Sequence, residues 1–388
     1  MKKFINPFYF VIFLSSLLFY LLKLDYKNYK YIDLHGFPYY IIILNIMFII
    51  LGLAIPLMKY NTLNIKKYNY NLKYNKYFMK ILKVMLAIGV FCTIIKIIIV
   101  FKNIGLPTNP LFFVQSRMAF FRGEFHFPFI IQVGAFLLFP SLVCFLLLYK
   151  FKKYNKKYIL ALIVIMIILN DVIIGGRGVI AFVFIYILFF NLFFDNFLHK
   201  DITYIKNIII GLTIVISFFI YINTIREGSN FYNALEQLIS YMIGPFFATF
   251  IDLTKLFNDP VHTYGFYTFG GILRYLINLN LDFGYVPIYK NYNMGFNSFL
   301  YISYIVRDFG FAGSLLFSFI IGIIAQYLYI SLKRNFELIK FLIFINIMIL
   351  LFFFFRDIAS KWTSWWTILF TIFIMIIGGV KIEKNTNS

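Results

Sequence analysis

Long uninterrupted runs of apolar residues recur along the whole sequence of 388 residues, and they limit the possible folds more than any other feature. A helix needs about 20 apolar residues to cross the hydrocarbon core of a bilayer. Lipid offers a backbone no hydrogen-bond partner, so a segment that crosses it must satisfy its own N–H and C=O groups. Runs of this length predict helices. The sequence therefore predicts an all-α polytopic integral membrane protein.

Ten stretches are long and apolar enough for this role, or nearly so. They are Phe8–Leu24, Tyr39–Met58, Phe78–Val100, Phe127–Leu148, Tyr158–Ile174, Val179–Phe194, Asn207–Thr224, Phe311–Ile330, Ile339–Phe355 and Trp362–Val380. A further stretch, Leu235–Phe257, is interrupted by polar residues, and we expect it to form interfacial helices or to dip into the membrane. If it crosses, there are 11 or 12 spans. We expect residues 1–388 to form a single membrane domain.

Composition and charge exclude several other classes of protein. Hydrophobic residues make up 62% of the chain, whereas soluble domains contain about 45–50%, and a disordered chain is excluded for the same reason. The net charge of +21 does not indicate nucleic-acid binding, because its lysines lie in short loops and not on one soluble face. Cys92 and Cys144 both lie in apolar runs, so no disulfide framework is expected.

Lysine placement predicts the orientation of the chain. Every second loop is basic, and the N-terminus shares that side. The loop lysines are Lys59, Lys66, Lys67, Lys73, Lys76 and Lys80, then Lys150, Lys152, Lys153, Lys156 and Lys157, then Lys200 and Lys206, then Lys333 and Lys340, and finally Lys381 and Lys384. Basic loops stay in the cytoplasm, so both termini are predicted to be cytoplasmic. Residues 225–310 then form one long loop on the opposite, outer side.

Arginine is distributed in the opposite way to lysine. Of the eight arginines, only Arg334 falls on the predicted cytoplasmic side. The outward arginines are Arg117, Arg122, Arg177, Arg226, Arg274, Arg307 and Arg356. A guanidinium grips phosphate or carboxylate through two parallel hydrogen bonds, which lysine cannot do. The set therefore predicts a ligand such as a lipid-linked pyrophosphate, although a salt bridge or headgroup contact explains any single arginine equally well.

Two local motifs place arginines at the outer ends of predicted spans. Gly175-Gly176-Arg177-Gly178 forms a tight turn, where glycines allow a close approach to a ligand. A plain hairpin with an arginine reaching the interface is the alternative. The second motif leads from Asn297 through Tyr304, Arg307, Asp308 and Gly310 to Gly313. Its alternative is a simple N-terminal helix cap.

These features together resemble the O-antigen polymerases, the Wzy-type polymerases of oligosaccharide repeat units. The resemblance covers the Gly-Gly-Arg-Gly turn, the long outer loop, the Asn297–Gly313 run and the spacing of Arg274 and Gly284. It implies a multi-pass protein of the cell inner membrane that acts on the periplasmic side. The implied activity transfers a growing glycan from undecaprenyl pyrophosphate to an undecaprenyl-pyrophosphate-linked repeat unit. A chain-length regulator protein is an expected further partner, besides the membrane lipid.

The residues also limit the chemistry of such a transfer. The sequence has no phosphate-binding loop for ATP and no His-rich or Cys-rich metal cluster, so no cofactor and no metal are expected. Arg177, Arg226, Arg274 and Arg307 are the predicted pyrophosphate ligands. A base must accept the proton of the acceptor hydroxyl. His262 is the first candidate because imidazole titrates near neutrality, and Asp308 is the second.

Two other functions are left open by the sequence. An O-antigen ligase would use the same donor with a lipid A core as acceptor. A transporter or flippase for lipid-linked glycan usually carries charges deep within its spans. Lys96 is the only clearly intramembrane charge of this sequence, which counts against transport.

Reporter fusions test the predicted orientation directly. Fusions after Lys67, Lys153 and Lys333 should report cytoplasm, and fusions near Pro260 and Lys290 should report the outer side, because basic loops are retained inside. A cytoplasmic signal at Pro260 would contradict the orientation and remove the outer site.

Overall fold

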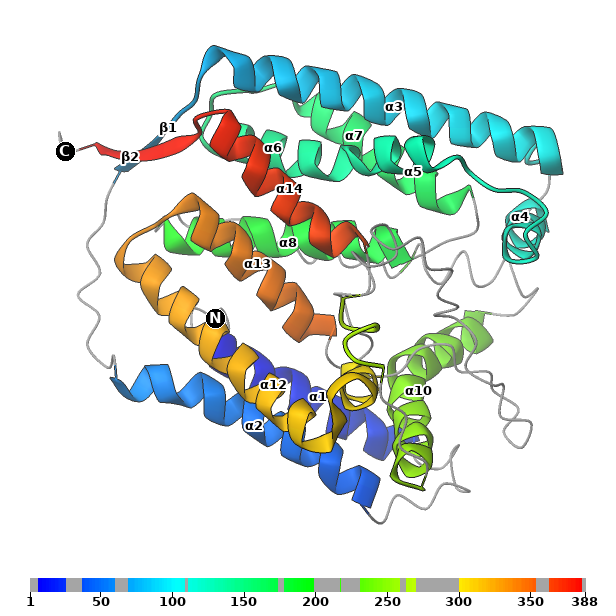
Figure 1. Ribbon diagram of the computed structural model, residues 1–388, viewed down its shortest axis with the longest axis vertical. Coiled ribbons are helices and arrows are strands. Elements are labelled where there is room, and N and C mark those ends of the chain that lie inside the picture. The colour runs from blue at the N-terminus through cyan, green and yellow to red at the C-terminus, as the bar shows by residue number, and fades with distance from the viewer. Residues whose placement is uncertain are drawn as a thin grey trace. The chain divides into compact units, whose positions relative to one another are not determined.

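The computed structural model describes residues 6–25, 37–59, 69–108, 111–173, 178–198, 217, 231–258, 263–269, 300–353 and 363–385. These residues are mostly helical, with one pair of short strands (Figure 1). The architecture agrees with the predicted all-α class. The strand pair was not predicted.

The helices follow the predicted apolar stretches closely. The helices are α1 (Pro7–Asp25), α2 (Phe37–Lys59), α3 (Lys76–Ile104), α4 (Leu111–Phe121), α5 (Phe129–Phe136), α6 (Leu138–Lys150), α7 (Lys157–Val172), α8 (Gly178–Phe197), α10 (Phe231–Asn258), α12 (Tyr301–Arg334), α13 (Leu338–Phe353) and α14 (Thr363–Ile377), and the strands are β1 (Asn69–Lys73) and β2 (Lys381–Asn385). The stretch Asn207–Thr224 lies outside the described residues apart from Ser217. The stretch Leu235–Phe257 belongs to one continuous helix, α10, which contains Pro245.

Four helical segments of the described residues are long and apolar enough to cross a membrane. They are Phe37–Lys59, Lys76–Ile104, Phe129–Lys150 and Tyr301–Arg334. Shorter apolar helices are Pro7–Tyr20, Phe182–Phe197, Leu338–Phe353 and Trp365–Ile377. The protein is thus helical and has the character of a multi-pass membrane protein, while the predicted ten crossings and their orientation stay predictions.

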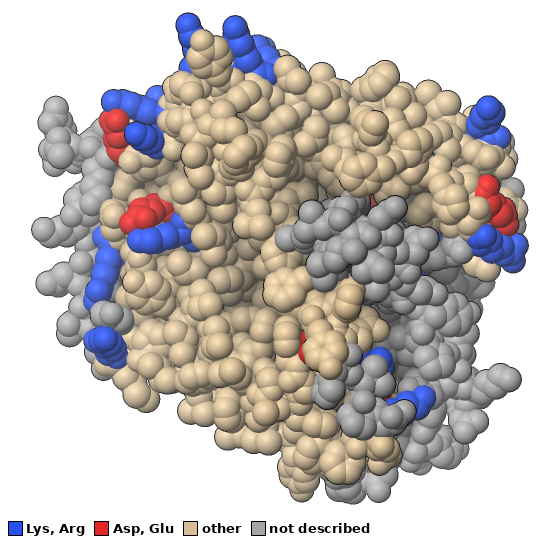
Figure 2. Space-filling view, viewed as in Figure 1, with Lys and Arg blue, Asp and Glu red and all other residues tan. Residues whose placement is uncertain are grey.

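The outward faces of these helices are apolar, as a lipid environment requires. Along α2 the exposed large side chains recur every three or four residues, which places them on one face of the helix. They are Tyr40, Leu44, Met47, Leu51, Ile55 and Met58. Few charged side chains interrupt the face shown in Figure 2. An exposed apolar surface of this kind marks contact with a membrane or a partner.

Contacts divide the chain into two compact units, each assembled from distant segments. The first unit comprises Met1–Lys66, Leu192–Asp201 and Leu235–Trp366, and the second comprises Lys67–Asn191, Ile202–Ala234 and Thr367–Ser388. In the first, α12 packs along α2, with α1 and α13 against them. In the second, α3 packs against α4, α5, α6 and α7. Neither unit corresponds to the predicted loop 225–310, and the single membrane domain stays a prediction.

The second unit also contains the ribbon of β1 and β2. The two strands are antiparallel, with Leu72 opposite Ile382. The exposed side chains of Lys73 and Glu383 form an ion pair with a nitrogen–oxygen distance of 2.6 Å. Next to the ribbon, the Asn75 amide donates to the Ile377 carbonyl at 3.1 Å. The ribbon therefore joins the start of α3 to the end of α14.

Two glycines allow α2 and α12 of the first unit to cross closely. A Cβ atom at Gly52 would lie 2.2 Å from the Phe319 carbonyl oxygen, and one at Gly322 would lie 2.5 Å from the Ile49 carbonyl oxygen. Small residues permit such close backbone approach between helices in a membrane, where packing replaces the hydrophobic effect as the driving force. This crossing fixes the position of α12 against α2, and with it the position of the residues at the start of α12.

Buried polar side chains reinforce the same crossing. Asn45 on α2 donates to the Ser314 hydroxyl at 3.1 Å and accepts from the Ser318 hydroxyl at 2.6 Å. The Ser318 hydroxyl also bonds the Tyr301 hydroxyl. All four residues are buried. Because an unpaired polar group in hydrocarbon is costly, this network favours one register of the two helices.

Enlarging Gly322 should loosen this crossing. Gly322→Leu places a side chain where even a Cβ atom meets the backbone of α2, and overpacking of this kind costs about 1–3 kcal/mol. We expect a lower midpoint of thermal unfolding for the full chain in detergent. Ala87→Leu is the control, since Ala87 is exposed on α3. Equal midpoints for both variants would contradict the close crossing.

Candidate functional site

Helix α12 is broken at Gly310, directly after the arginine motif. Gly310 has φ 72° and ψ 178°, which is not helical. The Tyr301 ring lies 6.3 Å from the Phe317 ring, and its hydroxyl bonds Ser318. The segment before the break therefore folds back along the start of the segment after it. Asp308 consequently does not cap the helix that begins at Phe311, so the N-terminal cap considered for the motif is wrong.

Arg307 is fixed by a carboxylate that is distant in sequence. Its Nε donates to Asp252 Oδ2 at 3.1 Å, and its Nη2 forms a second bond to Oδ1. The Ser303 hydroxyl donates to the same carboxylate. Asp252 has a side-chain exposure of 2%, against 26% for Arg307. Buried Asp252 thus orients a guanidinium that is partly open to solvent.

The ion-pair alternative considered for the arginines therefore applies to Arg307, but with a different partner. The partner is Asp252, 55 residues earlier in the sequence, and not the adjacent Asp308. An arginine has five N–H donors, so pairing with one carboxylate is compatible with binding a ligand as well.

Asp308 holds a short turn, Thr263–Phe269, onto the end of the first segment of α12. Its Oδ1 accepts from the Thr263 hydroxyl at 2.6 Å and from the Tyr267 N–H at 3.2 Å. Its Oδ2 accepts from the N–H and the hydroxyl of Thr268, at 2.6 and 2.5 Å. The Thr263 N–H also donates to the Arg307 carbonyl at 2.8 Å. The turn and the arginine are therefore held as one piece.

Four donors occupy both oxygens of the Asp308 carboxylate. A general base needs an oxygen directed at the proton that it accepts. This geometry favours a positioning role for Asp308, and its role as a base stays a prediction.

A second polar cluster lies in the second unit and includes Asp171, which precedes Gly175-Gly176-Arg177-Gly178 in the sequence. Lys96 on α3 is buried, and its ammonium donates to Asn170 Oδ1 at 2.9 Å. The same ammonium lies 5.0 Å from the centre of the Phe127 ring. Asp171, the next residue along α7, accepts from the Val179 N–H at 3.0 Å. It thereby satisfies a backbone donor at the start of α8.

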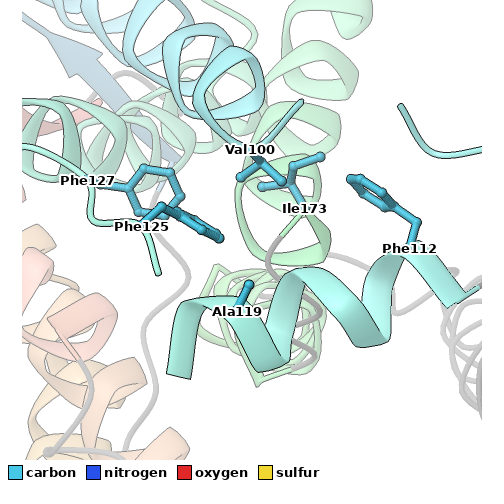
Figure 3. Close-up of a cluster of buried hydrophobic side chains, with 6 residues drawn as sticks. All are labelled: Val100, Phe112, Ala119, Phe125, Phe127 and Ile173. Carbon is cyan, nitrogen blue, oxygen red and sulfur yellow. The ribbon is translucent and has the colours of Figure 1, made fainter. Parts of the chain in front are cut away.

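Apolar packing fixes the other side of this turn. Ile173 belongs to a buried cluster with Val100, Phe112, Ala119, Phe125 and Phe127 (Figure 3). The Ser116 hydroxyl on α4 donates to the Ile173 carbonyl at 2.6 Å. Ile173 and Val179, the described residues on either side of the glycine turn, are therefore both anchored.

The predicted site residues are only partly covered by the structure. Arg307 and Asp308 are described and lie together. The others, Arg177, Arg226, Arg274 and His262, lie outside the described residues. The structure adds Asp252 as the partner of Arg307 and Asn170 as the partner of Lys96. The signal for both was a polar side chain within an otherwise apolar helix.

Comparisons with known proteins give no further assignment. No family model matches the chain, no curated protein matches it, and no solved structure matches it. Among the described residues, no three His, Cys, Asp or Glu side chains are grouped so that they could hold a metal ion. Metal-independent chemistry stays a prediction.

Removing the charge of Asp308 should release the turn. Asp308→Asn replaces one acceptor oxygen by an NH₂ group, which would point at the N–H and hydroxyl donors of the turn. It also removes the charge, and each hydrogen bond to a charged group contributes about 1.5–3 kcal/mol to stability. We expect amide hydrogen exchange at 263–269 to rise more than tenfold. Glu124→Gln is the control, because its carboxylate is half exposed. Unchanged exchange would contradict the anchoring role.

Proposed function

We propose that this protein is a polysaccharide polymerase of the inner membrane. It would transfer a growing surface glycan from undecaprenyl pyrophosphate onto an undecaprenyl-pyrophosphate-linked repeat unit on the periplasmic side. The observation that carries the proposal is Arg307, a partly exposed guanidinium oriented by buried Asp252 beside a helix break. By the predicted orientation this break lies at the outer end of its span.

The reaction requires no energy source beyond the donor. The oxygen of an acceptor hydroxyl forms a bond to the anomeric carbon of the donor glycan, and the bond from that carbon to pyrophosphate breaks. The electron pair leaves with the pyrophosphate, whose charge the arginines would stabilise in place of a metal. The proton of the hydroxyl passes to a base. We propose His262 for this role, since the four bonds of Asp308 engage it elsewhere.

The second cluster supports a role for Arg177 in the same chemistry. Asp171 anchors Val179, and Ser116 anchors Ile173, so the chain enters and leaves the Gly-Gly-Arg-Gly turn at fixed points. A ligand-binding group held by rigid surroundings loses less entropy when it binds. We propose that Arg177, Arg226 and Arg274 join Arg307 in holding pyrophosphate.

A transporter for lipid-linked glycan is the second candidate, and two observations favour it. Broken helices and charges buried within spans are common in transporters, and here α12 is broken and Lys96 is buried. An O-antigen ligase would share the donor site of the polymerase.

Deletion of the gene, followed by a gel of the surface glycan, separates these functions. Loss of the polymerase should change a ladder into core plus a single repeat. A ligase deletion would leave long chains unattached to core. A transporter deletion would leave repeat units on the cytoplasmic face, with no repeat on the core, and this result would overturn the proposal.

Replacement of Arg307 by lysine tests the guanidinium itself. Arg307→Lys keeps the charge but loses the planar fork that holds both Asp252 and a phosphate. We expect at least a tenfold loss of polymerisation at normal protein level, measured as ladder length and as the rate in membrane vesicles. Arg122→Lys is the matched control, since Arg122 is an exposed arginine with a long ion pair of 3.7 Å. Full activity of Arg307→Lys would reduce Arg307 to an ion pair with Asp252.

A further inference from the structure

The turn Thr263–Phe269 exposes a tyrosine in a backbone conformation that tyrosine rarely adopts. Tyr264 has φ 49°, and 83% of its surface is exposed. The left-handed conformation is sterically unfavourable for a residue with a Cβ atom. Glycine or asparagine would adopt it with less strain.

The turn that carries this tyrosine is held in place by hydrogen bonds. Five hydrogen bonds join the turn to Arg307 and Asp308. The next residue, Gly265, is buried with φ 90°, and a Cβ atom there would lie 3.0 Å from the Phe269 ring. Strained residues that are held this firmly cluster at ligand-binding positions. The backbone of Tyr264 is therefore set by the fold.

The turn that carries Tyr264 contacts Arg307, the cation of the proposed pyrophosphate site, through Thr263 and Tyr267. The Thr263 N–H bonds the Arg307 carbonyl, and the Arg307 guanidinium lies 5.9 Å from the centre of the Tyr267 ring. A pyrophosphate bound at Arg307 carries its first sugars away from the membrane. The C–H faces of a pyranose are weakly positive, and the face of an aromatic ring is negative.

We infer that Tyr264 is a sugar-binding platform that stacks on a pyranose ring of the lipid-linked glycan. The inference rests on the proposed function and deepens it, because it names a subsite for the sugar beside the site for the phosphates. Tyrosine is also common at membrane interfaces, and a lipid-facing anchor is the alternative that the experiments separate.

The first experiment uses a variant that removes the ring without straining the backbone. Asparagine tolerates the left-handed conformation better than other residues with a Cβ atom, so Tyr264→Asn should fold at least as well as the native chain. The substrate is the lipid-linked repeat unit extracted from cells that lack this gene, supplied to membrane vesicles holding the full chain. We expect KM for this substrate to rise about tenfold, the equivalent of about 1.4 kcal/mol. Tyr264→Trp should restore it to within about twofold, because a larger ring still stacks.

The matched control is Tyr40→Ala, which removes an exposed aromatic from α2 and should leave KM unchanged. A native KM for Tyr264→Asn, with activity lost in Arg307→Lys, would overturn the sugar subsite and leave the proposed function standing. If the native chain shows no polymerisation at all, the proposed function and the subsite both fail.

The second experiment locates Tyr264 without depending on activity. The native cysteines, Cys92 and Cys144, are buried, so Tyr264→Cys supplies the accessible thiol. A membrane-impermeant maleimide should label this thiol in intact spheroplasts. Labelling that appears only after detergent is added would place residue 264 in lipid or inside the cell, and would overturn the platform.

Discussion

A membrane offers no water to a polar group, and every interruption of a helix must be satisfied by the protein itself. The described residues meet this need with side chains at the places where helices begin or break. Thr249 accepts from the Leu300 N–H at the start of α12, Asp171 accepts from the start of α8, and Asp308 accepts from the turn beside Gly310. The turn that Asp308 holds also bonds the backbone of Arg307, the candidate arginine that the structure describes. Folding and the proposed chemistry therefore draw on one small set of carboxylates and hydroxyls.

The positions of the helices could be predicted from the sequence because apolar length is a local property. The expected stretch Phe8–Leu24 corresponds to α1, Pro7–Asp25, and Ile339–Phe355 corresponds to α13, Leu338–Phe353. The start of a span expected at Phe311 falls on the residue after the break at Gly310. The helical segment before that break was not predicted, since its residues Tyr301–Phe309 read as the end of a loop.

The partners of the charged residues could not be predicted in the same way. Arg307 and Asp308 are adjacent in sequence, but successive residues of a helix point about 100° apart, so they meet different elements. Arg307 pairs with Asp252, 55 residues earlier in the sequence. Asp308 bonds the turn Thr263–Phe269, about 40 residues earlier. Lys96 was recognised as an intramembrane charge, whereas Asn170, its partner 74 residues later, was not. Such pairings depend on how helices pack, which no local pattern records.

The ribbon of β1 and β2 has a topological consequence for the whole chain. Its two strands are paired, and its exposed pair of Lys73 and Glu383 belongs in water. In the predicted membrane arrangement, residues 73 and 381 would therefore lie on one side, and the number of crossings between them would be even, independently of where the lysines lie. Eight of the predicted spans fall in this interval, which satisfies the condition. A single additional crossing by α10 would violate it, so this helix either crosses in company with another segment or does not cross.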